Sequence, residues 1–152
     1  MAIEEQIENA GALTAVFGEW PSFHDAEIVR MHLERGPDQP YLEAAIHVFR
    51  MTKEIDDHGF YVLTNHTLVT IRFTGIVLYE LKWFNHQNAI DGLEIWPAED
   101  GEGKFSVEMP SNNGCDARFN CDAIAVLSVE PFEPAAQQAP LAGVTMQPGR
   151  PV

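Results

Sequence analysis

Apolar residues recur at every second position over much of the chain, and this alternation restricts the possible folds more than any other feature. Over residues 29–33 and again over residues 42–48, apolar side chains alternate with polar or smaller ones. A period of two is typical of a strand with one buried and one exposed face. Gly36-Pro37-Asp38 lies between the two runs and favours a turn. We therefore predict two antiparallel strands joined by a loop of about six residues.

Strand character continues to residue 130. Further strands are predicted over residues 61–63 with 66–73, 77–83, 90–96, 105–109 and 115–130, the last as one long strand or as two strands broken near Asp122. Residues 52–60 are predicted to form an exposed loop, and residues 110–114 contain an Asn-Gly pair typical of a hairpin turn. The pattern predicts an α+β domain with a mostly antiparallel β-sheet of roughly seven strands.

At the N-terminus the apolar spacing is three or four residues instead of two. The residues with this spacing are Ile3, Ile7, Ala10, Thr14 and Phe17. They predict one helix over residues 3–17, which Gly18 ends and which Pro21 prevents from continuing.

Residues 133–152 are rich in proline, alanine and glutamine and have no apolar periodicity. Such a segment cannot bury enough apolar surface to offset the entropy lost on ordering. We therefore expect one domain over residues 1–132, followed by a flexible C-terminal tail.

The chain is strongly acidic. Its 152 residues include 23 acidic and 9 basic ones, so the formal net charge is −14 at pH 7, and the pI is about 4.6. Such a surface repels nucleic-acid phosphates and anionic membranes, and it attracts basic proteins. We expect neither a nucleic acid nor a membrane as partner. Acidity can also simply keep a protein soluble, and both explanations stay open.

No targeting segment is expected. No apolar run approaches the ~20 residues that span a bilayer. The first five residues are acidic, whereas a signal peptide begins with basic residues and continues into an apolar stretch. The expected compartment is the cytoplasm.

Cysteine and histidine do not form a recognisable metal-binding motif. Cys115 and Cys121 share one strand face and would lie ~20 Å apart, too far for a disulfide, so we expect two buried thiols. The six histidines include no pair on one helical turn. Strand pairing could bring His32 near His47, but side chains on an exposed face can meet without binding anything. We expect polar surface histidines and no metal or cofactor.

Residues 20–27, called the Trp20–Glu27 block below, combine two aromatic residues, a proline, a histidine and two carboxylates. One interpretation is catalytic, with His24 as a general base that Asp25 orients. Adjacent residues of a strand point to opposite faces, however, so this pair would be geometrically awkward. Asp25 and Glu27 are two residues apart and would instead share a face as an acidic patch.

The other interpretation of the block is structural. Trp20 and Phe23 would fill the end of the sheet, while His24 or Asp25 would form hydrogen bonds with exposed backbone groups. We favour this interpretation because an acid–base pair needs a third group that the sequence does not show. No nucleophile motif or phosphate-binding glycine loop is present either, and we therefore predict no catalytic residue.

Residues 84–88 offer aromatic and amide groups, including Asn85, His86 and Asn88. They would suit a recognition surface, and they would equally suit a turn whose side chains bind its own backbone. The sequence leaves both open.

The Trp20–Glu27 block resembles the signature of the bacterial polymorphic-toxin immunity protein family numbered fifty. The resemblance extends over residues 17–130 and includes four further blocks, at residues 49–52, 66–73, 84–88 and 127–130. It implies an α+β domain without catalytic activity that binds a cognate toxin, and it carries over no catalytic residue. An acidic surface would suit a basic toxin, because opposite charges accelerate association.

The leading hypothesis is therefore a cytoplasmic immunity protein that neutralises a cognate protein toxin by direct binding. The alternative is a small hydrolase-like or metal-binding protein that uses His24, Asp25 and Glu27. The toxin and the oligomeric state cannot be read from the sequence. The candidate recognition residues are Trp20, Phe23, His24, Asp25, Glu27, Asn85, His86 and Asn88.

Overall fold

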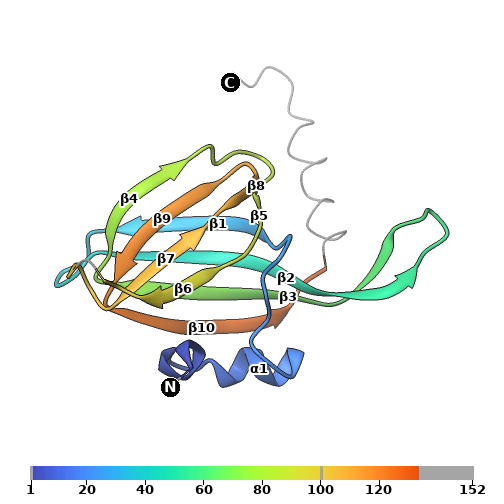
Figure 1. Cartoon of the computed structure of the whole chain (residues 1–152), viewed down its shortest axis with the longest axis horizontal. Coiled ribbons are helices and arrows are strands. Elements are labelled where there is room, and N and C mark those ends of the chain that lie inside the picture. Colours follow the sequence, from blue (N-terminus) through green and yellow to red (C-terminus); the bar gives the residue numbers. More distant parts are fainter. Residues whose placement is uncertain (1, 100, 134–152) are drawn as a thin grey trace, which may run out of the picture.

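The computed structural model describes residues 2–99 and 101–133. Within them, two antiparallel sheets pack face to face, and short N-terminal helices lie along one side (Figure 1). One sheet has six strands in the order β10-β3-β2-β1-β5-β8, and the other has four in the order β4-β9-β7-β6. The strands are β1 (Glu27–Glu34), β2 (Tyr41–Ile55), β3 (Tyr61–Thr74), β4 (Val77–Lys82), β5 (Ala89–Ile90), β6 (Glu94–Pro97), β7 (Phe105–Met109), β8 (Ser111–Asn113), β9 (Asp116–Cys121) and β10 (Ala123–Pro131).

The prediction of a mostly antiparallel β fold with an N-terminal helix is confirmed, but the predicted strand number is wrong. The described residues contain ten strands instead of about seven. Residues 90–96 split into β5 and β6, which belong to different sheets, and the predicted turn at residues 110–114 contains β8. The break near Asp122 separates β9 from β10, and the chain crosses from one sheet to the other there.

The predicted hairpin is present as β1 and β2, with Met31 opposite Ala44. The four even-numbered apolar residues from Leu42 to Val48 are all buried, as the alternation predicts. In β1 the predicted apolar face is wrong at Val29, which is exposed, whereas its neighbour Ile28 is buried. The register shifts between Ile28 and Arg30, so the core side of the strand passes from Ile28 to Met31, which lies opposite the buried Ala44 and packs against the core. Leu33 lies opposite Leu42 but is exposed.

The exposed loop predicted at residues 52–60 begins too early. Residues 56–60 connect the strands and are exposed, but β2 continues to Ile55 and β3 begins at Tyr61, so the connection is shorter than predicted. The hydroxyl of Thr52 donates a hydrogen bond across the ribbon to the Val62 carbonyl at 2.8 Å. Polar side chains suggested a loop here because both faces of this ribbon lie outside the core.

The helix predicted over residues 3–17 is interrupted. A 3₁₀ helix, η1 (Ile3–Gln6), and an α-helix, α1 (Gly11–Phe17), are separated by an extended residue, Glu8, that forms a parallel bridge with Ala125 of β10. The Glu8 N–H donates to the Ile124 carbonyl at 2.9 Å, and the Glu8 carbonyl accepts from the Val126 N–H at 2.9 Å. Gly18 ends α1 as predicted, in the left-handed conformation with φ of 82°.

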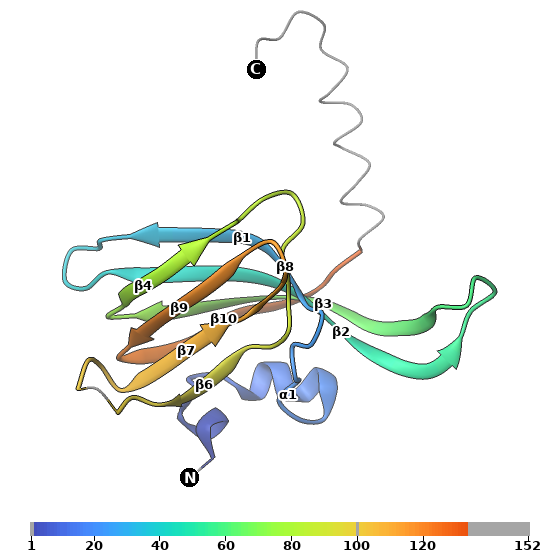
Figure 2. The same ribbon diagram turned by 45° about the horizontal axis from the view of Figure 1, so that its top comes forward.

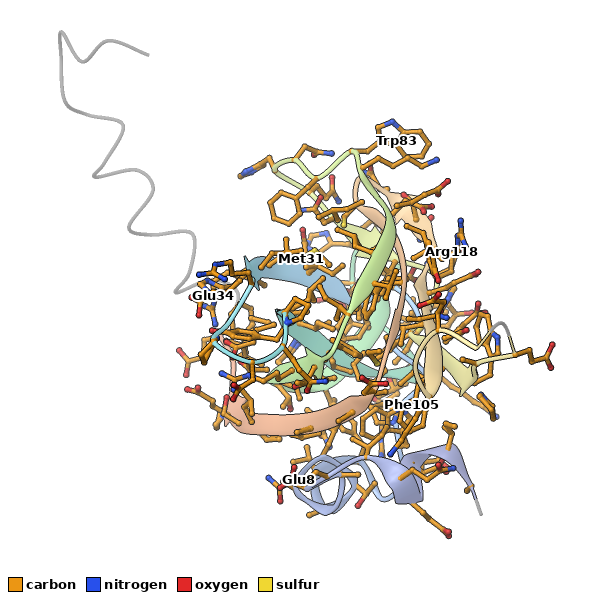
Figure 3. All side chains as sticks on the ribbon, turned by 90° about the vertical axis from the view of Figure 1, so that its left-hand side faces the viewer. Glu8, Met31, Glu34, Trp83, Phe105 and Arg118 are labelled. Atoms are coloured by element: carbon orange, nitrogen blue, oxygen red, sulfur yellow. The ribbon has the colours of Figure 1, made fainter. Side chains whose placement is uncertain are left out.

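The N-terminal segment closes one open side of the sandwich. α1 packs against β10 and β3, while η1 contacts β6 of the other sheet (Figure 2). Figure 3 shows Glu8 on this side of the molecule and Trp83 on the opposite side. Leu13 and Phe17 of α1 are buried, so this short helix contributes side chains to the core. No helix among the described residues is long and apolar enough to cross a membrane.

Aromatic packing joins the two sheets. The rings of Phe73 on β3 and Phe119 on β9 meet edge to face, with centroids 4.9 Å apart. Cys115 and Cys121 are both buried free thiols, as predicted. Burial raises the pKa of Cys115 to about 11 and that of Cys121 to about 12. Both thiols therefore stay protonated and unreactive near neutral pH.

Apart from Glu133, the predicted C-terminal tail lies outside the described residues.

Candidate functional site

The Trp20–Glu27 block is a compact turn that leads into β1. Phe23 and Asp25 both have φ of 62°, a conformation that L-residues seldom adopt. The Ala26 N–H donates back to the Phe23 carbonyl at 3.0 Å. Paired bonds with Ile90 hold the turn on β5: the Asp25 N–H donates to the Ile90 carbonyl, and the Ile90 N–H donates to the Ala26 carbonyl, each at 2.9 Å. Surrounding structure thus stabilises an intrinsically unfavourable backbone.

The two aromatic residues of the block pack together. Phe23 is 1% exposed and belongs to the main core, as the structural interpretation expects. Trp20 is partly buried, and its ring centroid lies 5.6 Å from that of Phe23. Trp20 therefore covers the core at this end of the sandwich and remains partly exposed.

His24 and Asp25 are close together, contrary to the expectation that they would point to opposite faces. The distance between His24 Nε2 and Asp25 Oδ2 is 3.6 Å. The expectation failed because this segment is a turn and not a strand. His24 Nδ1 also lies 3.1 Å from the Asp91 carbonyl, and Asp25 accepts a hydrogen bond from the Asn112 side chain at 2.6 Å. These bonds connect the block to the chain segments beside it.

Glu27 connects the block to residues 84–88. Its carboxylate accepts a hydrogen bond from the backbone N–H of Asn88 at 2.9 Å. The Asn88 side chain is buried, and its amide donates to the Asn85 carbonyl at 2.7 Å and toward the Ile28 carbonyl at 3.5 Å. Its Oδ1 accepts from the N–H groups of Asn85, at 2.9 Å, and Cys115, at 3.1 Å. One buried amide therefore joins three segments that lie far apart in the sequence.

The rest of the 84–88 turn binds its own backbone. The Asn85 amide donates to the Trp83 carbonyl at 2.8 Å, and Asn85 Oδ1 accepts the N–H of Gln87 at 2.9 Å. His86 is exposed. Gly114 packs so closely against this turn that a Cβ there would lie 2.2 Å from the Gln87 carbonyl oxygen. The geometry matches that of a turn whose side chains bind its own backbone. His86, a candidate recognition residue in this segment, is exposed to solvent.

Of the two predicted carboxylates, Asp25 lies beside His24 and Glu27 is engaged elsewhere. Asp25 also accepts a hydrogen bond from Asn112, and Glu27 is bound to the Asn88 backbone. In the part of the chain that the structure describes, no group of three or more His, Cys, Asp or Glu side chains is placed to hold a metal ion.

Strand pairing does not bring His32 and His47 together. His32 lies opposite Glu43 in the β1–β2 register and stacks on Tyr41, whereas His47 lies opposite Glu27. His47 is instead half-buried beside His66 of β3, with 2.9 Å between His47 Nε2 and His66 Nδ1.

This pair sits between Phe49 and Phe132. Burial and the neighbouring His66 lower the pKa of His47 to about 4. The expected polar surface histidine is thus neutral and partly enclosed. Its signal in the sequence was its position directly before Val48 and Phe49 in an apolar strand.

A groove of about 260 Å³ runs beside the block. Pro21, Ser22 and His24 line one side of it, and Phe49, Arg50 and Met51 of β2 line the other. The His24 side chain is 60% exposed. The groove is therefore an open surface feature, and none of its walls supplies a nucleophile paired with a base.

A scan against protein-family models matches residues 9–132 to Immunity protein 50. Neither a curated protein nor a solved structure matches the chain. The family match spans the paired sheets from Asn9, next to the Glu8 bridge, to Phe132, one residue past β10. It also includes the two segments that a hydrogen bond joins at Glu27 and Asn88. Because the match covers most of the chain, the chain belongs to the Immunity protein 50 family.

Proposed function

We propose that this protein is a non-catalytic immunity protein that neutralises a cognate bacterial toxin by direct binding in the cytoplasm. The observation that carries the proposal is the family match over residues 9–132, which includes all ten described strands. The family implies a toxin as partner. The geometry of the Trp20–Glu27 block supports the same conclusion, because its polar side chains are engaged in holding the fold together.

The charge supports a basic partner. A net charge of −14 creates a field that attracts a basic surface and repels nucleic acid. An acidic inhibitor that occupies a basic substrate cleft would block a nuclease, and charge steering would accelerate capture by roughly 10- to 1000-fold. A toxin of another class with a basic surface would be bound by the same physical mechanism.

The test begins with the genes beside the one for this chain, where the proposal expects a toxin-bearing open reading frame, and it uses the toxin domain encoded there. Co-expression should restore growth of cells that produce the toxin, and the two purified proteins should form a complex measurable by calorimetry. The toxin's activity in vitro should fall in proportion to the complex formed. Rescue without any complex would contradict neutralisation by binding. Substrate turnover by this protein that disappears in His24→Ala would replace the proposal with an enzymatic function.

A further inference from the structure

The β2–β3 hairpin extends beyond its neighbouring strands. β1 pairs with β2 only as far as His47, and β10 pairs with β3 only from Thr67 onward. Residues 50–65, called the arm below, therefore form a two-stranded ribbon that projects from the sandwich (Figures 1 and 2). At ~3.3 Å per residue, the β2 half of the ribbon from Arg50 to Ile55 is about 17 Å long.

The arm exposes large apolar side chains. The strand register places Met51 opposite Leu63 and Ile55 opposite Tyr61, with an irregularity between the two pairs. The exposed fractions of Met51, Ile55 and Tyr61 are 45%, 64% and 56%, and that of Phe60 near the tip is 70%. Several large apolar side chains exposed together on one projecting element mark a contact surface.

The tip of the arm is an ordered turn. The Asp56 carboxylate accepts the backbone N–H groups of His58, at 2.8 Å, and Phe60, at 3.0 Å. The Asp56 N–H also donates to the Phe60 carbonyl at 2.8 Å. Phe60 is thus presented by a bonded turn, despite its high exposure.

The root of the arm is fixed to the end of α1. The Arg50 guanidinium donates to the Phe17 carbonyl, and the Asn65 amide donates to the Val16 carbonyl at 3.1 Å. Both strands of the ribbon therefore satisfy carbonyl groups that the helix end would leave unpaired. A ribbon ordered at both ends loses little conformational entropy when it binds, which favours affinity.

The charge of the arm selects the kind of partner. A two-stranded ribbon fits a protein cleft or the major groove of DNA. The tip carries Glu54, Asp56 and Asp57, while Arg50 and Lys53 lie closer to the root, on a chain with a net charge of −14. These carboxylates repel phosphates and anionic lipid headgroups, whereas they complement a basic protein surface.

We propose that the arm is the element that engages the toxin, inserting its exposed apolar side chains into a toxin cleft with a basic rim and an apolar floor. This inference rests on the proposed function and adds the contact surface to it. Met51, at the root of the arm, also lines the 260 Å³ groove beside Pro21 and His24. The exposed apolar side chains of the arm therefore begin at the edge of this groove.

The test compares matched aromatic and aliphatic truncations for binding to the purified toxin domain encoded beside this gene. Phe60→Ala and Ile55→Ala remove exposed arm side chains, so the melting temperature should stay that of the parent. Trp83→Ala is the control, because Trp83 is 63% exposed and lies outside the arm, between β4 and β5 (Figure 3). Each arm variant should raise the dissociation constant at least about tenfold, as hot-spot truncations do. The control variant should raise it less than about threefold.

Hydrogen exchange provides a second readout that does not depend on a variant. Toxin binding should slow amide exchange over residues 51–63, where the outer ribbon edges lack a neighbouring strand. Arm variants that bind like the parent, or an equal loss in Trp83→Ala, would overturn the assignment of the contact to the arm while leaving the immunity function intact. A parent protein that does not bind the toxin at all would remove the proposed function and this inference with it.

Discussion

Glu27 accepts the backbone N–H of Asn88 at 2.9 Å across 61 residues of sequence. This bond unites the two segments that most distinguish the chain, the Trp20–Glu27 block and the 84–88 turn. The buried Asn88 side chain then extends the connection to Cys115, at the start of the β9 region. The assembled segments form a brace at one end of the sandwich.

Asn88→Ala should lower the free energy of unfolding by about 2–4 kcal/mol, because it leaves buried backbone groups of Asn85 and Cys115 without their partner. Urea denaturation measures the change. Asn113→Ala, at an exposed residue of β8, is the control and should cost less than about 0.5 kcal/mol. Equal stability of the two variants would show that the brace does not stabilise the fold.

Phe23→Ala should cost about 3–5 kcal/mol, the usual range for a fully buried aromatic residue. Trp20→Ala should cost less, since Trp20 is only partly buried. Thermal melts monitored by circular dichroism would rank the two variants. If both keep the parent's stability and lose toxin binding, the block is a recognition surface and not part of the core.

His47 should make the protein less stable in mild acid. Its pKa is about 4 in the folded protein against an ordinary value of 6.5, so the unfolded chain binds more protons between these pH values. His47 does not lower the free energy of unfolding above pH 6.5, and it lowers this free energy progressively as the pH falls from 6.5 toward 4. Because the ring is half-exposed and solvent screens it, we expect an effect of about 1–2 kcal/mol.

Unfolding free energies measured from pH 7.5 to pH 4.5 provide the test. His47→Gln should flatten this pH dependence, and the exposed His86→Gln should leave it as in the parent. A histidine resonance that titrates near pH 6.5 and is absent from His47→Gln would contradict the assignment.

Association with the toxin should slow as salt rises, because ions screen charges over about 10 Å at 0.1 M salt. Asp57→Asn and Glu54→Gln should reduce the association rate at low salt and have little effect at high salt. Asp56 is a poorer probe, since its carboxylate also holds the turn at the arm's tip. Stopped-flow measurements across a salt series provide the rates, and rates indifferent to salt would remove the electrostatic argument.

Truncation after Glu133 should leave the melting temperature nearly unchanged. The removed residues lack the apolar periodicity that core segments have. Differential scanning calorimetry of the full and shortened chains measures this directly. A loss of many degrees would mean that the tail packs on the domain.

Local patterns in the sequence predicted the parts of the fold that depend on local periodicity. The alternation from Leu42 to Val48 correctly identified the buried face of β2. The same pattern failed at Val29, because the β1 bulge shifts the register and alternation carries no information about bulges. It also failed at residues 90–96, where the chain leaves one sheet for the other within a few residues.

The site was harder to predict because its contacts join distant segments. The block was recognised from its residues, but its partner Asn88 was visible only as an amide in a polar turn. The helix prediction over residues 3–17 failed for a similar reason. Helical spacing is local, whereas the bridge of Glu8 to Ala125 depends on an edge strand formed more than a hundred residues later.

That bridge has a consequence for the protein in a crowded cell. β10 is the outermost strand of the six-stranded sheet, and an edge strand offers unpaired N–H and C=O groups to any other chain. Glu8 occupies the groups of Ile124 and Val126, and the Asn9 amide binds the Val126 carbonyl as well. Glu8 and Asn9 thereby cover this part of the sheet edge and hinder its pairing with other copies, although neither side chain belongs to the core.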